Sequence, residues 1–242
     1  MCTVSFIPFN HGYRLGMNRD EQRTRFKGIF PKPLVRRGVE IVGPCEPSGG
    51  RWIVTNSAGV TFALLNWYSR SQPDLIEPYS RGELVDSLAC LKSLGEVEDS
   101  ISNQPLGRIR PFRLLGVSQR TELICEWRWD GVTLEKFEHP WSAGLWASSG
   151  YDESGAQENR RMYFDLVSRE RFQTSAGMRA FHGSHDPTKG ALSVCMHRRE
   201  AATVSYTEVT IEPGKGAVFY LDGPLCELSV GRGAETRFCI DS

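Results

Sequence analysis

The sequence predicts an α+β protein that folds as a layered sandwich in a single domain, residues 1–242. Two observations carry this prediction. Strand-like segments run in pairs through most of the chain, and two amphipathic helical patterns separate the blocks of strands. The composition agrees, because 40% hydrophobic and 24% charged residues are ordinary values for a soluble globular protein. We therefore expect one main fold rather than several domains.

Strands are predicted from the N-terminus onward. Residues 3–9 and 13–17 form a hairpin, joined by the polar turn Asn10-His11-Gly12. A second pair is expected at residues 51–55 and 60–65, across the turn 56–59. The remaining predicted strands cover residues 112–117, 123–129, 142–146, 192–196, 203–211, 216–221 and 235–240.

Two helices are predicted between these strands. Ser80 and Glu83 have the spacing of a capping box, which satisfies the free backbone donors at a helix start. The apolar stripe behind this box contains Leu84, Val85, Leu88 and Leu91. The second helix is expected over residues 156–172. Its predicted apolar face contains Met162, Tyr163, Leu166 and Val167, and the side chains expected to point mostly outward are Arg160, Arg161, Arg169 and Glu170.

Charge and hydropathy exclude several classes of partner. Lys+Arg and Asp+Glu balance at 29 each, so no net field attracts nucleic acid or an anionic membrane. No apolar run approaches the roughly 18 residues of a membrane span, and the N-terminus lacks the regions of a secretory signal. Seven scattered cysteines without a Cys-x-x-Cys arrangement indicate reduced thiols. We predict a cytoplasmic monomer or homodimer that acts on a small molecule, without nucleic acid or a transmembrane segment.

Cys2 is the first residue that suggests chemistry. Methionine aminopeptidase removes Met1 readily when the next side chain is as small as Cys, so the mature chain would begin with a thiol beside a free α-amine. The α-amine has an ordinary pKa of about 8 and can accept the proton of the thiol as a general base. The resulting thiolate is the competent nucleophile. The alternative is that a Met-Cys start has no chemical role.

A charged cluster, Gly16-Met17-Asn18-Arg19-Asp20-Glu21, follows the second predicted strand. A hairpin brings the end of one strand beside the beginning of the other, so the cluster is expected next to Cys2. There a carboxylate can hold the α-amine, and a guanidinium can stabilise the thiolate or a charge on the substrate. The alternative is a turn with a surface ion pair, which contributes little to stability.

These residues resemble a known family. Met1-Cys2 followed by Asn18-Arg19-Asp20-Glu21 resembles the NRDE family, which is named for that tetrad and includes the transport and Golgi organization protein 2 group. Three more blocks occur in the order of the family. Residues 50–66 resemble its GGTW…ALTN hairpin, residues 80–85 its SRGELV helix start, and residues 193–205 a C-terminal signature of bacterial members. The resemblance spans nearly the whole chain.

The NRDE family in turn resembles the choloylglycine hydrolase and penicillin acylase branch of N-terminal-nucleophile (Ntn) hydrolases. This resemblance implies a four-layer αββα sandwich. It implies that Asp20 holds the α-amine of Cys2 and that Asn66 donates an oxyanion-hole hydrogen bond worth about 3 kcal/mol. Arg19 lies two positions from the arginine of that branch, and a shift of two along a strand keeps the same face.

Two features concern the remaining pocket residues. The branch has a second asparagine where this chain has Ala147. Either Ser148 or Ser149 substitutes for it, or the site does not hydrolyse amides of that type. If residues 192–196 form a strand that continues to His197, Cys195 and His197 share one face. If that face points at the cleft, His197 and Arg198 border the substrate. Otherwise His197 is a surface side chain. The residues expected to bind substrate are Asn18, Ser148, His197 and Arg198.

Two further groups of residues are candidates for a metal or a cofactor site. His182, His185, Cys195 and His197 are of types that bind zinc, but their spacing fits no zinc motif, so we expect no metal and no cofactor here. Six tryptophans occur in the chain, and core packing is the default interpretation for them. An aromatic pocket for a flat ligand such as haem is the alternative.

The sequence therefore predicts a cysteine Ntn hydrolase that cleaves linear amide bonds. Cys2 attacks the carbonyl and its α-amine moves the proton, while Asp20 and Arg19 position these groups and Asn66 binds the oxyanion. Water then releases the covalent acyl-enzyme. The alternative is a non-catalytic binding or trafficking protein that carries a hydrophobic ligand such as haem on the same fold.

Overall fold

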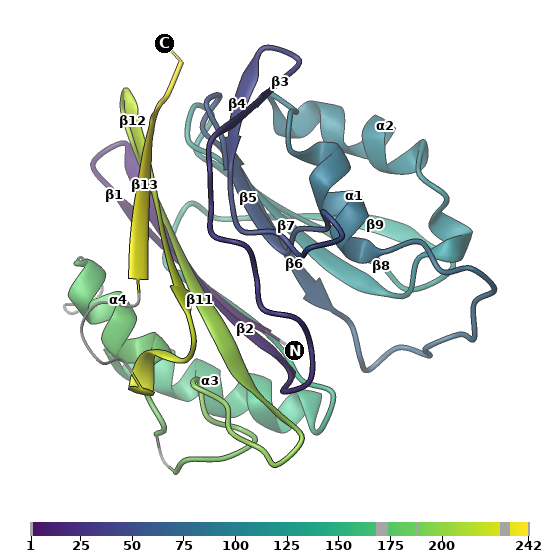
Figure 1. Cartoon of the computed structure of the whole chain (residues 1–242), viewed down its shortest axis with the longest axis vertical. Helices are drawn as coiled ribbons and strands as arrows, with labels where there is room; N and C mark the ends of the chain where they lie inside the picture. The colour runs from purple at the N-terminus through teal and green to yellow at the C-terminus, as the bar shows by residue number, and fades with distance from the viewer. Residues whose placement is uncertain (1, 168–173, 187, 228–232, 242) are drawn as a thin grey trace.

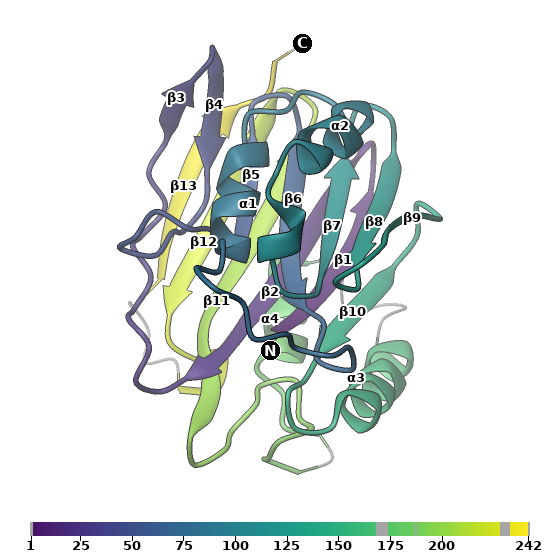
Figure 2. The ribbon, with the colours of Figure 1, turned by 90° about the vertical axis from the view of Figure 1, so that its right-hand side faces the viewer.

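The fold is a four-layer sandwich in which two antiparallel β-sheets stack face to face and helices cover their outer faces (Figures 1 and 2). The computed structural model describes residues 2–167, 174–186, 188–227 and 233–241. This arrangement confirms the predicted α+β class and the αββα layers. Among the described residues, no helix is both long enough and apolar enough to cross a membrane.

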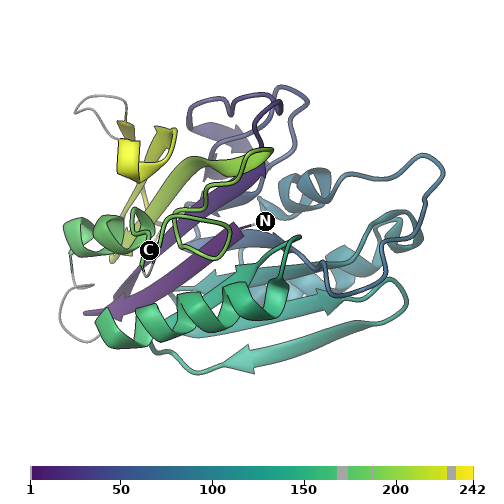
Figure 3. The same cartoon turned by 90° about the horizontal axis from the view of Figure 1, so that it is seen from below.

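The first sheet contains six strands in the described part of the chain, in the order β10-β1-β2-β11-β12-β13. Their bounds are β1 Cys2–Phe9, β2 Gly12–Gln22, β10 Gly144–Ser148, β11 Ala201–Glu212, β12 Lys215–Asp222 and β13 Gly233–Cys239. Its outer face is covered by α3 Glu153–Val167 and α4 Ser175–His182, which lie together at one end of the molecule (Figure 3). β1 lies between β10 and β2, so it is paired on both sides and is not an edge strand of this sheet.

The second sheet contains seven strands in the described part of the chain, in the order β3-β4-β5-β6-β7-β8-β9. Their bounds are β3 Leu34–Arg36, β4 Val39–Val42, β5 Ile53–Asn56, β6 Val60–Asn66, β7 Phe112–Ser118, β8 Leu123–Trp129 and β9 Leu134–His139. Its outer face is covered by α1 Arg81–Leu88 and α2 Val97–Ser102 (Figure 2). Short 3₁₀ turns connect several of these elements: η1 Leu94–Glu96, η2 Leu106–Arg108 and η3 Leu225–Glu227.

The predicted N-terminal hairpin is confirmed. β1 pairs with β2 from Cys2↔Arg19 to Phe9↔Gly12, and the turn residues Asn10 and His11 have φ angles of 29° and 61°. Positive φ at both central residues gives a turn whose twist matches that of the flanking strands. The pairing places the start of the chain opposite the charged end of β2.

Side chains of β1 alternate between the two faces of the first sheet. Cys2, Val4 and Phe6 belong to the core between the two sheets, whereas Ile7 packs in the core beneath α3 and α4. The side chain of Thr3 meets that helical layer through α3. Because neighbouring strands share the alternation, each position of β2 also faces either the second sheet or the helices.

The first helix agrees with its sequence signature. The Ser80 hydroxyl accepts a hydrogen bond of 3.1 Å from the Gly82 amide, and the Glu83 carboxylate accepts one of 3.3 Å from the Ser80 amide. The helix buries Leu84, Val85 and Leu88 against the second sheet.

The predicted face of the second helix is only partly correct. Tyr163 and Val167 pack against the core beneath α3 and α4 as expected. Met162 and Leu166 are 65% and 81% exposed, however, and Arg160, expected to point outward, is fully buried. Its buried residues Ala156, Arg160 and Phe164 are spaced four apart and form one stripe. The apolar pattern misled because a buried carboxylate on the first sheet draws Arg160 inward. The predicted end at residue 172, with Arg169 and Glu170, lies outside the described residues.

The predicted strand at residues 192–196 is also wrong, since this segment is irregular. The isolated bridge His197↔Ala202 begins one residue after it. The polar backbone groups of the segment are satisfied outside a sheet. The Cys195 amide donates to the Ser184 carbonyl at 2.9 Å, and the Val194 carbonyl accepts from the Asn18 side chain at 2.9 Å. The elements that the sequence did not predict are β3, β4, β9, α2 and α4.

The tryptophans confirm the core interpretation. Trp127 and Trp129 pack in the core beneath α1 and α2, and Trp146 packs in the core between the sheets. Trp141 contacts the rings of Phe6 and Tyr13 at centroid distances of 4.8 and 5.9 Å. These four rings therefore build the fold rather than a separate aromatic pocket.

A buried charge cluster holds β7, β8 and β9 together. The carboxylate of Glu126, which is 1% exposed, contacts Arg113 at 2.5 Å, Arg128 at 2.8 Å and His139 at 2.9 Å. Arg113 also donates to the Ala147 carbonyl of β10 at 3.3 Å, so the cluster links the second sheet to the first. Burial would raise the pKa of Glu126, but the hydrogen bonds from His139 and Arg128 and the charge of Arg113 hold it well below its usual value.

Glu126→Gln is expected to lower the free energy of unfolding by about 3 kcal/mol near pH 7, because Arg113 and Arg128 lose their buried counter-charge. As the pH falls below 4.5, the ordinary pKa of Glu, the unfolded chain binds a proton before the folded chain does, so wild type loses this stabilisation. The difference between wild type and variant should therefore shrink near pH 3. Urea denaturation at both pH values checks this, and exposed Glu135→Gln is the control. A pH-independent difference would contradict the prediction.

Candidate functional site

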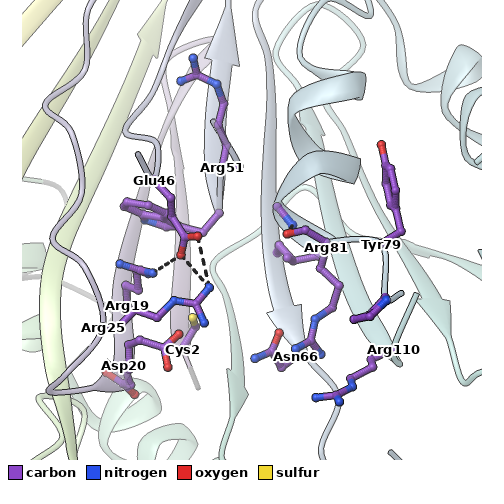
Figure 4. A pocket seen from close by; sticks show the side chains of 17 residues that line it. Cys2, Arg19, Asp20, Arg25, Glu46, Arg51, Asn66, Tyr79, Arg81 and Arg110 are labelled. Atoms are coloured by element: carbon purple, nitrogen blue, oxygen red, sulfur yellow. Dashed lines mark hydrogen bonds and ion pairs between the residues drawn. The ribbon is translucent and has the colours of Figure 1, made fainter. Parts of the chain in front are cut away.

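A cavity of about 340 Å³ lies between the two sheets, beside the first residue of β1 (Figure 4). Cys2, Arg19 and Asp20 line one side, and Asn66, Arg81 and Arg110 line the other. The rest of the lining is formed by Glu21, Arg25, Glu46, Gly50, Arg51, Trp52, Leu64, Pro78, Tyr79, Ser80 and Gly82. Most side chains around this cavity are polar or charged, whereas those farther along β1 and β2 toward the hairpin turn are apolar.

Cys2 is held from both sides by neighbouring strands. It is opposite Arg19 of β2 and opposite Ser148 of β10, and its side chain is 8% exposed. Its backbone nitrogen donates a hydrogen bond of 3.1 Å to the Ser148 hydroxyl. Ser148 itself is fully buried and does not line the cavity. The expectation that Ser148 binds substrate is therefore corrected, because its hydroxyl is used by the nitrogen of Cys2.

Arg19 reaches the cavity from the same face of the sheet as Cys2. Its guanidinium contacts the Glu46 carboxylate at 2.5 Å and lies 4.3 Å from the centre of the Trp52 ring. These two contacts fix a long side chain along the cavity wall. The positive charge of Arg19 lowers the pKa of the Cys2 thiol.

Asp20 is buried and held by two elements. One carboxylate oxygen accepts a hydrogen bond of 2.7 Å from the Thr203 hydroxyl of β11, and the other lies 3.4 Å from a guanidinium nitrogen of Arg160. The same nitrogen of Arg160 donates to the Thr3 hydroxyl at 2.7 Å. Burial raises the pKa of the Asp20 carboxyl, and the charge of Arg160 and the Thr203 hydrogen bond oppose that rise.

The surroundings of Cys2 favour the protonated thiol. Burial raises its pKa, and the negative charge of Asp20 raises it further. The backbone N–H of Asp20 and the charge of Arg19 lower the pKa without cancelling the effect of burial. The thiol is therefore protonated near pH 7 in this form of the chain, and a neighbouring proton acceptor is required to form the thiolate.

Asn66 reaches the cavity from the second sheet. It ends β6, and its side-chain amide donates a hydrogen bond of 2.8 Å to the Tyr68 hydroxyl. An amide nitrogen carries two N–H groups, so one remains available for a ligand in the cavity. Figure 4 shows Asn66 across the cavity from Cys2.

Asn18 does not face this cavity. Alternation along β2 turns its side chain toward the helical layer, where its amide donates to the carbonyls of His182 and Val194 at 2.8 and 2.9 Å. The side chain is fully buried. Asn18 thus joins the loops of that layer to β2, and the expectation that it binds substrate is corrected.

His197 and Arg198 do not line the cavity at Cys2 either. His197 borders a second cavity of about 250 Å³, which shares Arg19 and Arg25 with the first. Arg198 pairs with Glu200, and its guanidinium lies 4.8 Å from the centre of the Tyr151 ring. The prediction assumed a strand at 192–196, and the loop found there directs both side chains elsewhere.

Sequence reasoning missed Arg160 and the arginines of the opposite wall, Arg81 and Arg110. A stripe of three residues at a spacing of four in α3 was the available signal for Arg160. No local pattern distinguishes Arg81 and Arg110 from surface arginines. Among residues that could hold a metal, His185, Cys195, His197 and Cys226 come together outside the Cys2 cavity, with all ligand atoms within 4.8 Å of one another.

Comparison with known proteins gives a fold and no family. No family model matches the sequence, and no curated protein matches it, so the NRDE resemblance stays a prediction. A mutant of conjugated bile acid hydrolase from Clostridium perfringens is similar in structure, with a TM-score of 0.56 at 14% identity over 92% of this chain and 89% of that chain. A second variant of that enzyme is similar with a TM-score of 0.53 at 14% identity, over 100% of this chain and 97% of that chain.

Penicillin V acylase from Agrobacterium tumefaciens is also similar, with a TM-score of 0.56 at 11% identity over 98% of this chain and 90% of that chain. The likeness extends over nearly the full length of each protein. At such low identity it shows that this chain has the fold of these proteins.

Arg160→Met is expected to lower the free energy of unfolding by about 3 to 5 kcal/mol, because it leaves the buried Asp20 carboxylate without its counter-charge. Adding Asp20→Asn removes that charge, so the double variant should recover part of the loss. A double-mutant cycle measured by urea denaturation gives the interaction energy. Arg120→Met, in an exposed turn, is the control and should change stability little. Additive losses at Arg160 and Asp20 would show that the two side chains do not interact.

Proposed function

We propose that this protein is a cysteine Ntn hydrolase that cleaves linear amide bonds, acting in the cytoplasm as a monomer or a homodimer, with residues 1–242 as one domain. One observation carries the proposal: Cys2, Arg19, Asp20 and Asn66 line a single cavity, although they come from three strands of two sheets. The structural likeness to a conjugated bile acid hydrolase and a penicillin V acylase supports the class of reaction.

Maturation is the first step of the proposed mechanism. Removal of Met1 turns the backbone nitrogen of Cys2 into an α-amine on the carbon next to the thiol-bearing carbon. The Ser148 hydroxyl, 3.1 Å from that nitrogen, accepts one of its hydrogen bonds. The negative charge of Asp20, whose carboxyl is anchored by Arg160 and Thr203, stabilises the ammonium form. An α-amine has an ordinary pKa of about 8, which suits a general base near neutral pH.

The chemical steps then follow from these groups. The α-amine takes the thiol proton, and the thiolate sulfur forms a bond to the amide carbonyl carbon while the carbonyl oxygen becomes an oxyanion. The intermediate collapses by breaking the C–N bond, and the α-ammonium gives its proton to the leaving amine. Water attacks the resulting thioester, the α-amine accepts a proton from that water, and the carboxylic acid leaves. The proton then returns to the thiolate.

Asn66 is the proposed oxyanion donor. Its Nδ2 is oriented by the Tyr68 hydroxyl, which uses one N–H, and the second N–H is directed to the oxyanion. A donor of this kind contributes about 3 kcal/mol to transition-state stabilisation. Arg19 is the second positive group near the reacting atoms, and it stabilises the thiolate.

The charge of the cavity indicates the class of substrate. Among the described residues, Arg19 and Arg25 are paired with Glu46, and Arg51 is paired with Asp86. Arg81 donates to the Pro111 carbonyl at 3.0 Å and has no ion pair with a described carboxylate, and neither has Arg110.

These two arginines repel each other, and relief of that repulsion favours an anion. Burial lowers the pKa of Arg81, and the charge of Arg110 lowers it further. We therefore propose a substrate with a carboxylate or another anionic group on the Asn66 side of the cavity. The same charged lining does not favour a hydrophobic ligand such as haem, so binding of haem is not proposed.

Cys2→Ala is expected to abolish hydrolysis of N-acyl amino acids, because the nucleophile is lost, and exposed Cys239→Ser should retain wild-type rates. Iodoacetamide near pH 7 should label Cys2 at least about tenfold faster than Cys239. A tenfold higher thiolate fraction at Cys2 corresponds to a thiol pKa about one unit lower than that of Cys239. Peptide mass spectrometry measures both rates. Equal labelling of the two thiols, or turnover by the Cys2→Ala variant, would refute Cys2 as the nucleophile.

The pH dependence of hydrolysis provides a separate prediction. The α-amine must be unprotonated to accept the thiol proton, so kcat/KM should rise with pH as the amine loses its proton, with a midpoint of about 8. Initial rates between about pH 6 and pH 10 give the profile. A rate that falls over this range would contradict the amine as general base.

Arg110→Gln is expected to raise KM about tenfold for an N-acyl amino acid with a free carboxylate, because it removes about 1.4 kcal/mol of charge-assisted binding. The neutral methyl ester of the same substrate should be affected little. Arg108→Gln is the matched control, since Arg108 is exposed, pairs with Glu77 and does not line the cavity. Equal effects of Arg110→Gln on the acid and the ester would contradict the proposed anionic substrate.

A further inference from the structure

Four potential metal ligands meet outside the Cys2 cavity. His185, Cys195 and His197 lie in the loop between α4 and β11, and Cys226 lies in η3 after β12. The two sulfurs are 3.4 Å apart, and the Nε2 of His197 lies 3.6 Å from the Cys195 sulfur and 3.3 Å from the Cys226 sulfur. The His185 ring completes the group, with its centroid 5.0 Å from that of His197. All four ligand atoms lie within 4.8 Å of one another.

The separations among Cys195, His197 and Cys226 fit a tetrahedral zinc site. With Zn–S bonds of about 2.3 Å and Zn–N bonds of about 2.0 Å, tetrahedral angles put two sulfurs about 3.8 Å apart and a sulfur and a nitrogen about 3.5 Å apart. The observed distances of 3.4, 3.6 and 3.3 Å differ from these values by less than about 0.5 Å. Two cysteines and two histidines are also a common ligand set of structural zinc. We propose that His185, Cys195, His197 and Cys226 bind one Zn²⁺ ion.

A buried nitrogen at the site supports the proposal. The Nε2 of His185 is buried, and the described residues offer it no hydrogen-bond partner. A buried polar atom without a partner destabilises the fold unless a hydrogen bond or a metal ion satisfies it. An imidazole nitrogen without a hydrogen-bond partner can instead coordinate a metal ion at the centre of the group.

A disulfide between Cys195 and Cys226 is the competing chemistry. It requires the sulfurs to approach to about 2.05 Å, whereas they lie 3.4 Å apart, which is closer to the spacing on zinc. A disulfide also gives no role to the two histidines that converge on the same point. The composition of the group therefore favours a metal.

The ligands are held by their own backbone contacts. The Cys195 amide donates to the Ser184 carbonyl at 2.9 Å, and the His197 amide donates to the Gly190 carbonyl at 3.0 Å. His197 also forms a bridge with Ala202 at the start of β11. The loop thus presents its ligands in a fixed geometry, as a structural metal site requires.

The proposed ion would also support the site at Cys2. Met196, between two ligands, exchanges hydrogen bonds of 2.9 Å with Thr203: its amide donates to the Thr203 hydroxyl, and its carbonyl accepts from the Thr203 amide. The same Thr203 hydroxyl donates to Asp20. The ion would thus connect the loop and η3 to β11, whose Thr203 donates a hydrogen bond to Asp20. This role is structural and does not depend on hydrolysis.

The group of potential metal ligands identified in the sequence contained His182 and lacked Cys226. His182 is not part of the group, because its ring bonds to the Ser5 hydroxyl at 2.7 Å in the helical layer. Cys226 replaces it, which gives the pattern His-x9-Cys-x-His-x28-Cys. The long last spacing matches no compact zinc motif, and only the return of the chain after β12 brings Cys226 to the loop.

Metal analysis of the full-length protein tests the proposal. Protein purified under reducing conditions and dialysed against metal-free buffer should contain about one zinc per chain by elemental mass spectrometry. Cys226→Ser and His185→Ala should contain far less, and the controls Cys239→Ser and His11→Ala should retain the ion. Replacement by Co²⁺ should give the intense visible bands of a tetrahedral site together with a thiolate-to-cobalt charge-transfer band.

A second variant distinguishes loss of the metal from loss of folding. Cys226→His keeps a zinc ligand at this position, so it should fold and bind metal even if Cys226→Ser does not fold. Folded wild type that contains no zinc and gives no cobalt bands would overturn the proposal. Equal zinc in wild type and Cys226→Ser, or a Cys195–Cys226 disulfide in the reduced preparation, would also overturn it. None of these measurements requires a substrate, so their failure is distinct from failure of the proposed hydrolase.

Discussion

The buried ion pair between Asp20 and Arg160 is the interaction on which the arrangement of the site depends. Both side chains are fully buried, and a carboxylate buried without a counter-charge would cost several kcal/mol. Asp20 thus requires α3 to bring Arg160 against the first sheet, and Arg160 also bonds to Thr3 beside Cys2. The helix and the β1–β2 hairpin are therefore fixed relative to each other at the point where the chain begins.

Alternation along β2 divides the charged tetrad between two layers. Arg19 faces the cavity, where Glu46 and Trp52 hold it. Asn18 faces the helical layer, where its amide donates to a carbonyl at the end of α4 and to one in the following loop. Asp20 lies at the end of the sheet and is held from the helical side. One short segment thus provides a charge next to the Cys2 thiol, an anchor for α4 and the loop after it, and a buried carboxylate held by Arg160 and Thr203. The proposed metal ion would support the same region through Met196 and Thr203.

Local sequence patterns predicted those parts of the structure that are determined by contacts between residues close in the sequence. The hairpin, the capping box at Ser80 and the positions of Cys2, Arg19, Asp20 and Asn66 around one cavity follow from turns, spacing and family resemblance. Burial of Arg160 could not be predicted in this way, because its partner is 140 residues away and the helix pattern alone favours an apolar face. The same holds for the loop at 192–196, which bonds to side chains of distant strands, and for Cys226, whose neighbours lie 29 and 31 residues earlier.

The proposed mechanism requires that the mature chain begins with Cys2 and that its α-amine is the base. The intact mass of the catalytically active protein tests this requirement. We expect a mass lower than that of the full sequence by one methionine residue, with no modification that blocks the amine. Active protein that retains Met1, or that carries an acetylated N-terminus, would contradict the mechanism, because its terminal nitrogen could not take the thiol proton.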